Sequence, residues 1–192
     1  MFNNIINKMN HPPSPNPTPN PTPIPNPTGW GGRGNLGFPT CSYCVYSSYI
    51  FLANCLLAFY FEDYIYSLLF LCLAITSIIH HSSYNIYTSI IDKISVYCVI
   101  FYGGYIFYKK YKKNIEKNND NQENNDNKEN ISIFEYIKYF VVIITFLLVI
   151  FLYYYGYVTN NYTFHPDDRT AQLYHCIMHF IASFGHAIII SL

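Results

Sequence analysis

The chain has 192 residues, enough for one domain, and aromatic residues make up 19% of it whereas charged residues make up only 11%. Soluble domains contain roughly 25% charged residues, so this deficit indicates that much of the chain lies in lipid. The formal net charge is zero, and the Tyr and Phe residues fall within apolar runs instead of alternating with basic residues. This composition argues against nucleic-acid binding.

Residues 1–40 hold ten of the 11 prolines. A segment so rich in Pro, Asn and Gly cannot bury enough apolar surface to fold, and we expect a disordered tail with polyproline II character. The transmembrane domain is expected over residues 41–192. At its entrance, Cys41 and Cys44 form a single CxxC without a second pair, so we interpret the cysteines as small packing residues instead of a zinc ribbon or a disulfide framework.

Five apolar segments follow the tail, and each approaches the roughly 17–25 residues that cross a bilayer. Tyr residues gather at the segment ends, as is typical of membrane interfaces. Only Phe61, Glu62 and Asp63 separate the first two segments, which predicts a tight helical hairpin. The predicted fold class is an all-α polytopic transmembrane helix bundle of about five helices, with spans at residues 43–60, 64–81, 90–108, 133–157 and 171–192.

Residues 109–130 are rich in Asn, Lys and Glu and lack apolar periodicity. They predict a solvated polar loop of low complexity. The lysines at its start predict a cytoplasmic location for this loop. Counting crossings then places the tail, the end of the second span and the starts of the third and fifth spans on the lumenal or extracellular side. Both an endomembrane and the plasma membrane are compatible with this multi-pass arrangement.

Histidines concentrate on that predicted lumenal or extracellular side. His175 and His179 lie four residues apart, so one helical face presents both imidazoles to the same point, as in many zinc sites. A third imidazole comes from His81, or from His80 beside it, at the end of the second span. Together these histidines predict a buried zinc site; for any one of them, a hydrogen bond between helices is the alternative. His186 lies deeper on the same face and is interpreted as a packing contact.

Asp92 opens the third span on the same side, and Ser77 lies one helical turn before His81. Three neutral imidazoles leave a fourth zinc position for water, whose pKa then falls toward neutrality. We expect Asp92 to take or orient the proton of this water, and Ser77 to hydrogen-bond the water or an oxyanion. These parts predict a hydrolase.

The pattern of Ser77-x3-His81, then Asp92, then His175-x3-His179 resembles that of the CREST superfamily. This superfamily groups alkaline ceramidases, adiponectin and progestin receptors, haemolysin-III-like proteins and post-GPI-attachment phospholipase-like membrane proteins. The resemblance implies that the three histidines bind zinc and that the Asp and Ser belong to a hydrolytic centre. It also implies a lipid amide or ester as substrate, either ceramide-like or a phospholipid.

Members of this superfamily have seven membrane helices, and the two that are absent here fall between Asp92 and His175. Losing an even number of helices keeps the site on one side of the membrane, but it removes part of the wall of a substrate cavity. The alternative function is therefore a non-catalytic, receptor-like or structural membrane protein in which zinc is structural or absent. In either case membrane lipid is the expected partner, as substrate or environment, and oligomerisation is compatible with the shortened bundle.

Overall fold

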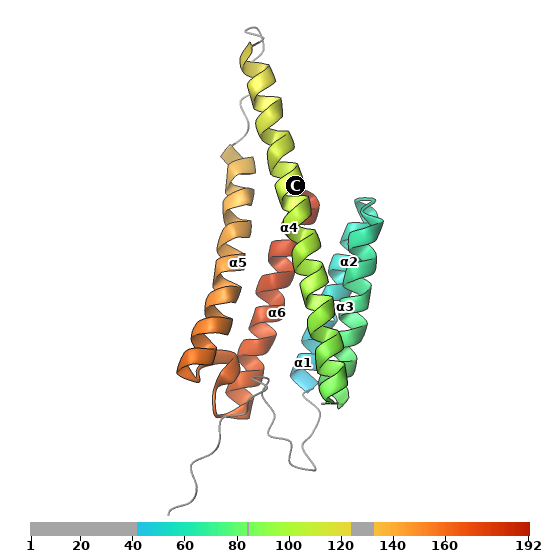
Figure 1. Cartoon of the computed structure of the whole chain (residues 1–192), viewed down its shortest axis with the longest axis vertical. Helices are drawn as coiled ribbons and strands as arrows, with labels where there is room; N and C mark the ends of the chain where they lie inside the picture. Colours follow the sequence, from blue (N-terminus) through green and yellow to red (C-terminus); the bar gives the residue numbers. More distant parts are fainter. Residues whose placement is uncertain (1–41, 84, 124–132) are drawn as a thin grey trace, which may run out of the picture.

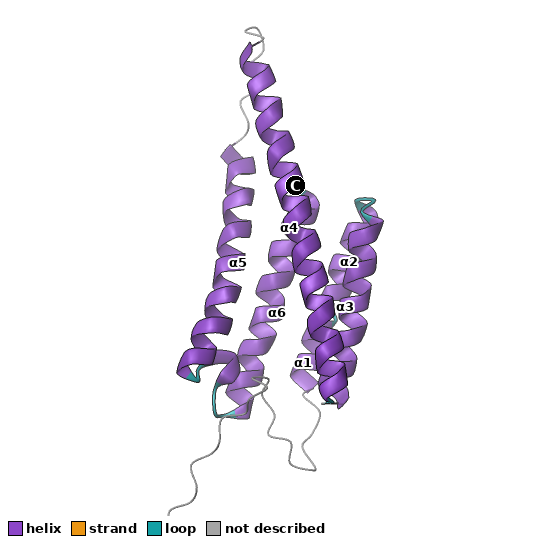
Figure 2. Ribbon diagram, viewed as in Figure 1, coloured by secondary structure: helices purple, strands orange, loops and turns teal. Residues whose placement is uncertain are grey.

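The computed structural model describes residues 42–83, 85–123 and 133–192, so the predicted disordered tail lies outside the described residues. All regular structure in the described part of the chain is helical (Figure 1, Figure 2). Five helical stretches are long and apolar enough to cross a membrane, which confirms the predicted helix bundle. They run over Tyr43–Tyr60, Tyr64–Ser83, Ile86–Lys117, Phe134–Phe164 and Asp168–Ser191.

The first span consists of two helices, α1 (Ser42–Ser48) and α2 (Ile50–Tyr60), with an interruption at Tyr49. The hydroxyls of Ser47 and Ser48 both donate hydrogen bonds to the carbonyl of Cys44, at 3.0 and 2.7 Å. Because such side-chain bonds compete with the main-chain bonds of a helix, paired serines favour an irregularity of this kind. The interruption therefore lies directly after the two serines.

A tight turn joins α2 to α3 (Tyr64–Ser83). The N–H of Asp63 donates to the carbonyl of Ala58 at 2.9 Å, and Glu62 adopts a left-handed backbone with φ of 61°. The carboxylate of Asp63 then accepts a hydrogen bond from the N–H of Tyr66 at 3.1 Å and caps the start of α3. The predicted helical hairpin is thus confirmed.

Helix α4 (Ile86–Glu123) has 38 residues and continues well beyond the predicted third span. At 1.5 Å per residue it is about 57 Å long, nearly twice the roughly 30 Å thickness of the bilayer core. The prediction of a loop was therefore wrong up to Glu123; the remainder, to residue 130, lies outside the described residues. The extension contains no Gly or Pro, and an i,i+4 ion pair between Lys112 and Glu116, at 3.7 Å, supports it.

The fourth span is α5 (Ile133–Thr159), and a short 3-10 helix, η2 (Tyr162–Phe164), leads from it to α6 (Asp168–Ser191). Asp167 caps α6, because its carboxylate accepts hydrogen bonds from the N–H and the hydroxyl of Thr170 at 2.8 and 2.7 Å. The side-chain hydrogen bond from Thr170, and then the backbone one, hold the pKa of Asp167 below its ordinary value. The last span therefore begins three residues before the predicted boundary.

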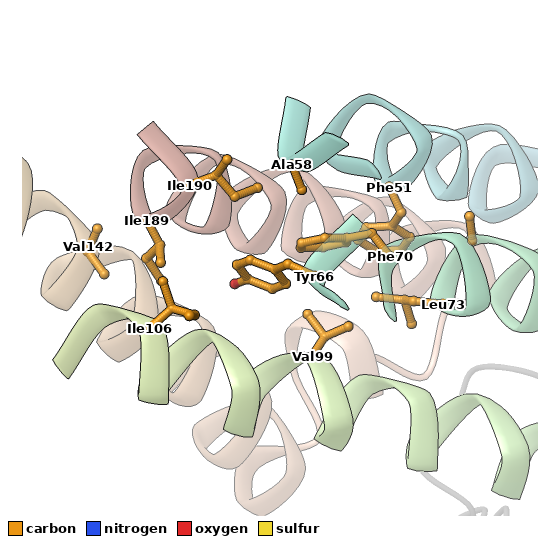
Figure 3. Close-up of a cluster of buried hydrophobic side chains, with 11 residues drawn as sticks. Phe51, Ala58, Tyr66, Phe70, Leu73, Val99, Ile106, Val142, Ile189 and Ile190 are labelled. Atoms are coloured by element: carbon orange, nitrogen blue, oxygen red, sulfur yellow. The ribbon is translucent and has the colours of Figure 1, made fainter. Parts of the chain in front are cut away.

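Helix α6 is the centre of the bundle, since it packs against α1, α2, α4 and α5. Figure 3 shows the main buried cluster, in which Tyr66 and Phe70 of α3 lie among side chains from α2, α4, α5 and α6. A small residue lets α5 approach α6, because a Cβ on Gly185 would lie 2.5 Å from the hydroxyl of Thr145. Close contact through small residues is typical of helix packing in membranes.

The start of α1, the turn between α3 and α4, and the connection from α5 to α6 all lie at the same end of the bundle (Figure 1). The turn between α2 and α3 lies at the opposite end. This arrangement agrees with the count of crossings made from the sequence. The last turns of α3 and the first turns of α4 and α6 consequently lie at the same end of the bundle, and these turns carry the predicted site residues.

Candidate metal centre

Three histidines from α3 and α6 come together at this end of the bundle. His81, His175 and His179 each offer one ring nitrogen, and these nitrogens lie within 4.8 Å of one another. The ring centroids are separated by 4.6 Å for His175 and His179, and by 5.1 and 5.6 Å from His81 to His175 and His179. We call these three residues the histidine cluster. The cluster contains His81 and not His80, whose ring lies beside that of His81 at 5.0 Å.

The surroundings of the histidine cluster fit a metal ion. His81 and His175 are buried, and the ring of Phe51 covers His179 at a centroid distance of 5.0 Å. The Nε2 atom of His81 is buried and has no hydrogen-bond partner among the described residues. A buried polar atom without a partner is unfavourable by about 1–3 kcal/mol, and a metal ion would supply that partner.

The distances within the cluster are compatible with zinc after a small adjustment. Three nitrogens that each lie about 2.0–2.1 Å from one zinc ion in tetrahedral geometry lie about 3.4 Å apart. The nitrogens here lie within 4.8 Å of one another, so a zinc ion would draw the side chains closer together. Three imidazoles without a carboxylate are also the ligand set of a zinc site that keeps one position open.

The hydroxyl of Ser47 determines which nitrogen of His179 is available to a metal. It lies 2.9 Å from the Nδ1 atom of His179, and it donates its single hydrogen to the carbonyl of Cys44. Since a hydroxyl has only one hydrogen, Ser47 accepts from His179, and Nδ1 therefore carries the ring proton. The lone pair then resides on Nε2, so Ser47 orients His179 as outer-shell residues orient metal-binding histidines.

The same reasoning assigns the hydrogen bond between Ser48 and Ser77. Their hydroxyl oxygens are 2.9 Å apart, and Ser48 already donates its hydrogen to the Cys44 carbonyl. Ser77 is therefore the donor to Ser48 and can only accept a hydrogen bond from a third group. In this arrangement Ser77 accepts a hydrogen bond from a third group such as water; donation to an oxyanion needs rotation of its hydroxyl, and both roles stay predictions.

Asp92 is buried on α4, where its carboxylate accepts a hydrogen bond of 3.4 Å from the hydroxyl of Thr76 on α3. It therefore faces the helix that carries both Ser77 and His81. Its oxygens do not belong to the group of nitrogens that lie within 4.8 Å of one another. Asp92 thus faces α3 and lies outside the group of three histidines, and its role as a proton acceptor stays a prediction.

The first span contributes Ser47 and Ser48, which the sequence reasoning missed, next to Cys44, which it interpreted as a packing residue. The thiol of Cys44 lies 3.9 Å from the carbonyl of Gln172 and 3.8 Å from the sulfur of Cys176, and these contacts join α1 to α6. The predicted relation of Cys44 to Cys41 is outside the described residues. A signal was present, because the three residues have i, i+3 and i+4 spacing and so form one polar face on an apolar helix.

The opposite end of the bundle has a second set of polar contacts. The hydroxyl of Tyr66 bonds the Nδ1 atom of His186, and Tyr102 donates to the carboxylate of Asp63 at 2.9 Å. The ammonium group of Lys110 donates to two carbonyls of the last turn of α6, at 2.9 and 2.8 Å. We call these five residues the far-end network. His186 is a contact between helices, as the sequence suggested.

The fold and the site thus define a five-span helix bundle with three converging imidazoles near one end. Comparison with known proteins adds no relative, since no protein-family model, no curated protein and no solved structure matches this chain.

Proposed function

We propose that this membrane protein is a zinc-dependent hydrolase that cleaves a lipid amide or ester bond. The observation that carries this proposal is the convergence of His81, His175 and His179, whose ring nitrogens lie within 4.8 Å of one another in the spanning part of the bundle. Ionisable residues at such positions are unfavourable in lipid and are usually functional. When bound, zinc supplies a Lewis acid that lowers the pKa of water toward neutrality.

Three side chains around the cluster have the remaining roles in the proposed reaction. Ser47 holds His179 in the tautomer that presents Nε2, as its hydrogen bond to Nδ1 requires. Ser77 accepts a hydrogen bond from the attacking water and orients it. Asp92, the buried acid on the neighbouring helix, takes the proton of that water as general base.

The reaction consumes one water molecule. The oxygen of the water forms a bond to the carbonyl carbon, and the C–O or C–N bond of the lipid breaks. Asp92 returns the proton to the leaving alcohol or amine, so that a fatty acid and an alcohol or amine are the products. The substrate enters laterally from the bilayer, and the resemblance to the CREST superfamily supports a ceramide-like lipid or a phospholipid.

We place the site on the lumenal or extracellular side of its membrane. The lysines that follow residue 108 are on the part of α4 that leads away from the histidine cluster. Clusters of lysine near a span favour the cytoplasmic side. The histidine cluster is at the opposite end of the bundle and is therefore assigned to the other compartment.

The test uses the full-length chain purified in detergent without added metal. We expect near-stoichiometric zinc by elemental analysis and release of fatty acid from a ceramide or a phospholipid. Asp92→Asn should keep its zinc and lose at least about 100-fold in turnover, which is the usual contribution of a general base. Ser95→Ala, one turn further along α4, is the matched control, because among the described residues the Ser95 hydroxyl bonds only to the Ile91 carbonyl of its own helix. Wild-type protein without zinc contradicts the proposal.

A second candidate function is a non-catalytic membrane protein in which zinc joins α3 to α6. The observation in its favour is that the carboxylate of Asp92 bonds Thr76 and lies outside the histidine cluster. This candidate predicts zinc without turnover of either lipid class, together with loss of folding when His175 and His179 are replaced by Ala. Retained folding with lost turnover in that double variant favours the hydrolase.

A further inference from the structure

An apolar groove lies between α1 and α6, next to the histidine cluster. It has a volume of about 580 Å³, and Cys176 forms part of its floor. Its other lining residues are Tyr43, Tyr46, Ser47, Arg169, Leu173 and Phe180. Tyr46 and Leu173 are 71% and 58% exposed, so the groove opens to the surroundings of the bundle. In a membrane those surroundings are lipid.

The groove has the length of one leaflet. It extends along α6 from Arg169, in the first turn, to Phe180. At 1.5 Å per residue this distance is about 16 Å, close to half of the roughly 30 Å bilayer core. The apolar span of α6 begins at Asp168, so the first turn of this helix lies at the membrane interface. The groove therefore leads from headgroup level toward the middle of the bilayer. A single acyl chain follows the same path.

Arg169 is the charged residue in the lining, and it is exposed at the headgroup end of the groove. Within the described residues its guanidinium group forms no ion pair within 4.0 Å, although its charge contributes to lowering the pKa of Asp167. Asp167, two residues earlier, uses its carboxylate to cap α6 through Thr170. Arginine binds phosphate through two parallel hydrogen bonds, whereas a ceramide offers no charge to this group.

The groove also reaches the histidine cluster. Ser47 lines the groove, and its hydroxyl bonds Nδ1 of His179 at 2.9 Å. His179 is followed directly by Phe180, which lines the apolar part. A lipid in the groove would therefore have its phosphate at Arg169 and its acyl chain between α1 and α6, passing Ser47 beside the cluster.

We propose that the groove binds a phospholipid from the bilayer, with the phosphate on Arg169 and one acyl chain between α1 and α6. As a statement about substrate, this rests on the proposed function, and it selects a phosphate-bearing ester over a ceramide. Water adds its oxygen to the acyl carbon, the ester C–O bond breaks, and the proton passes to the leaving oxygen. The products are a fatty acid and a lysophospholipid.

Binding is tested with full-length holoprotein and two ether-linked lipids that cannot be hydrolysed. One is a dioleyl-ether phosphatidylglycerol; the other is the dioleyl-ether glycerol with the same chains and no phosphate. Native mass spectrometry should show at least about tenfold tighter binding of the phospholipid, as charge-assisted hydrogen bonds give. Arg169→Gln should remove this difference, and Lys112→Gln, which neutralises an exposed lysine at the other end, should preserve it. Leu173→Trp should weaken both lipids by filling the groove.

The outcomes separate this inference from the proposed function. Equal binding of the two lipids by wild-type protein, or an unchanged preference in Arg169→Gln, overturns the phosphate site. A second assay then compares hydrolysis of phosphatidylcholine with hydrolysis of a ceramide. If wild-type protein hydrolyses neither lipid, the proposed function fails. The ether-lipid experiment still tests whether the groove binds a phospholipid. If Arg169→Gln raises KM for phosphatidylcholine about tenfold at similar kcat, both statements are supported.

Discussion

The buried polar groups at the two ends of the bundle differ in their hydrogen bonding. In the far-end network every group has a partner of opposite hydrogen-bonding character, such as Tyr102 with Asp63 and Lys110 with the carbonyls of α6. In the histidine cluster three imidazoles face one another, and Nε2 of His81 has no partner among the described residues. Several imidazoles that converge without hydrogen bonds to one another indicate a ligand site, whereas polar groups that are hydrogen-bonded in pairs indicate helix packing.

This difference matters because histidine occurs at both ends. His186 and His179 lie on the same helix, seven residues apart, and both are within the last span. One of them bonds a tyrosine from a neighbouring helix, and the other bonds a serine that leaves its second nitrogen directed toward two further imidazoles. The function of a histidine in a membrane span therefore depends on which group its second ring nitrogen contacts.

The largest expected effect comes from removing a ligand at the cluster end. His179→Ala should weaken zinc binding about 100- to 1,000-fold, since structural zinc sites with about four ligands bind with about 10–16 kcal/mol. Competition with a chromophoric chelator measures this change. His165→Ala is the control, because His165 lies in the connection before α6, where its ring accepts a hydrogen bond from the N–H of Asp167. An equal loss in the control would mean that the cluster is not the binding site.

The orienting residue should have the next largest effect. Ser47→Ala removes the acceptor for Nδ1 of His179 and leaves the ring free to change tautomer. Outer-shell substitutions of this kind reduce metal affinity by about 10- to 100-fold, which the same competition assay detects. Ser82→Ala offers a comparison, because the exposed Ser82 bonds only the carbonyl of Ile78 in its own helix. Affinity unchanged in Ser47→Ala would contradict the assigned tautomer.

At the far end, the comparison predicts that a substitution lowers the stability of the bundle and leaves its zinc content unchanged. A Cβ on Gly103 would meet the hydroxyl of Tyr66 and lie 2.8 Å from Cε1 of His186. Gly103→Ala should therefore destabilise the bundle by about 1–3 kcal/mol through overpacking, measured by unfolding in mixed micelles, with zinc content preserved. Gly104→Ala is a matched neighbour, since its Cβ would meet nothing within 4 Å. Equal destabilisation by both variants would remove the far-end network as the cause.

The smallest effect is expected at the cap of α6. Asp167→Ala should lower the thermal unfolding midpoint slightly at pH 7, because two orphan donors of Thr170 lose their acceptor. Since hydrogen bonds from Thr170 lower the pKa of Asp167, the cap contributes above the ordinary pKa of Asp and is lost as the pH falls below about 4. The difference between the midpoints of variant and wild type should therefore shrink as the pH falls below about 4. Asp167→Asn, which keeps an acceptor oxygen, should stay closer to wild type.

Hydropathy and spacing predicted the spans and the meeting of the histidines, because both depend on local periodicity and on the number of crossings. The choice between His80 and His81 needed the rotation of α3 in the bundle, although the spacing from Ser77 already favoured His81. The continuation of α4 to Glu123 escaped prediction because an Asn-rich sequence has weak helix propensity, and the ion pair and the preceding span compensate for it.

The sequence did not predict the roles of Ser47, Ser48 and Arg169. Their roles arise from contact between the first and the last spans, which are far apart in sequence. No periodicity within one span indicates which residue of another span lies opposite. The polar face of Cys44, Ser47 and Ser48 was visible in the sequence, but its partner, His179, became apparent only from the tertiary structure.

The hydrogen bond between Ser47 and His179 also bears on biogenesis. Membrane spans enter the bilayer in the order of their synthesis, so Ser47 and His81 are inserted long before His175 and His179 emerge. Until the last span arrives, the nascent protein has neither His175 and His179 nor the hydrogen bond that fixes the tautomer of His179. Under the proposed function, metal loading is therefore a late event in assembly that requires α3 and α6 to have met.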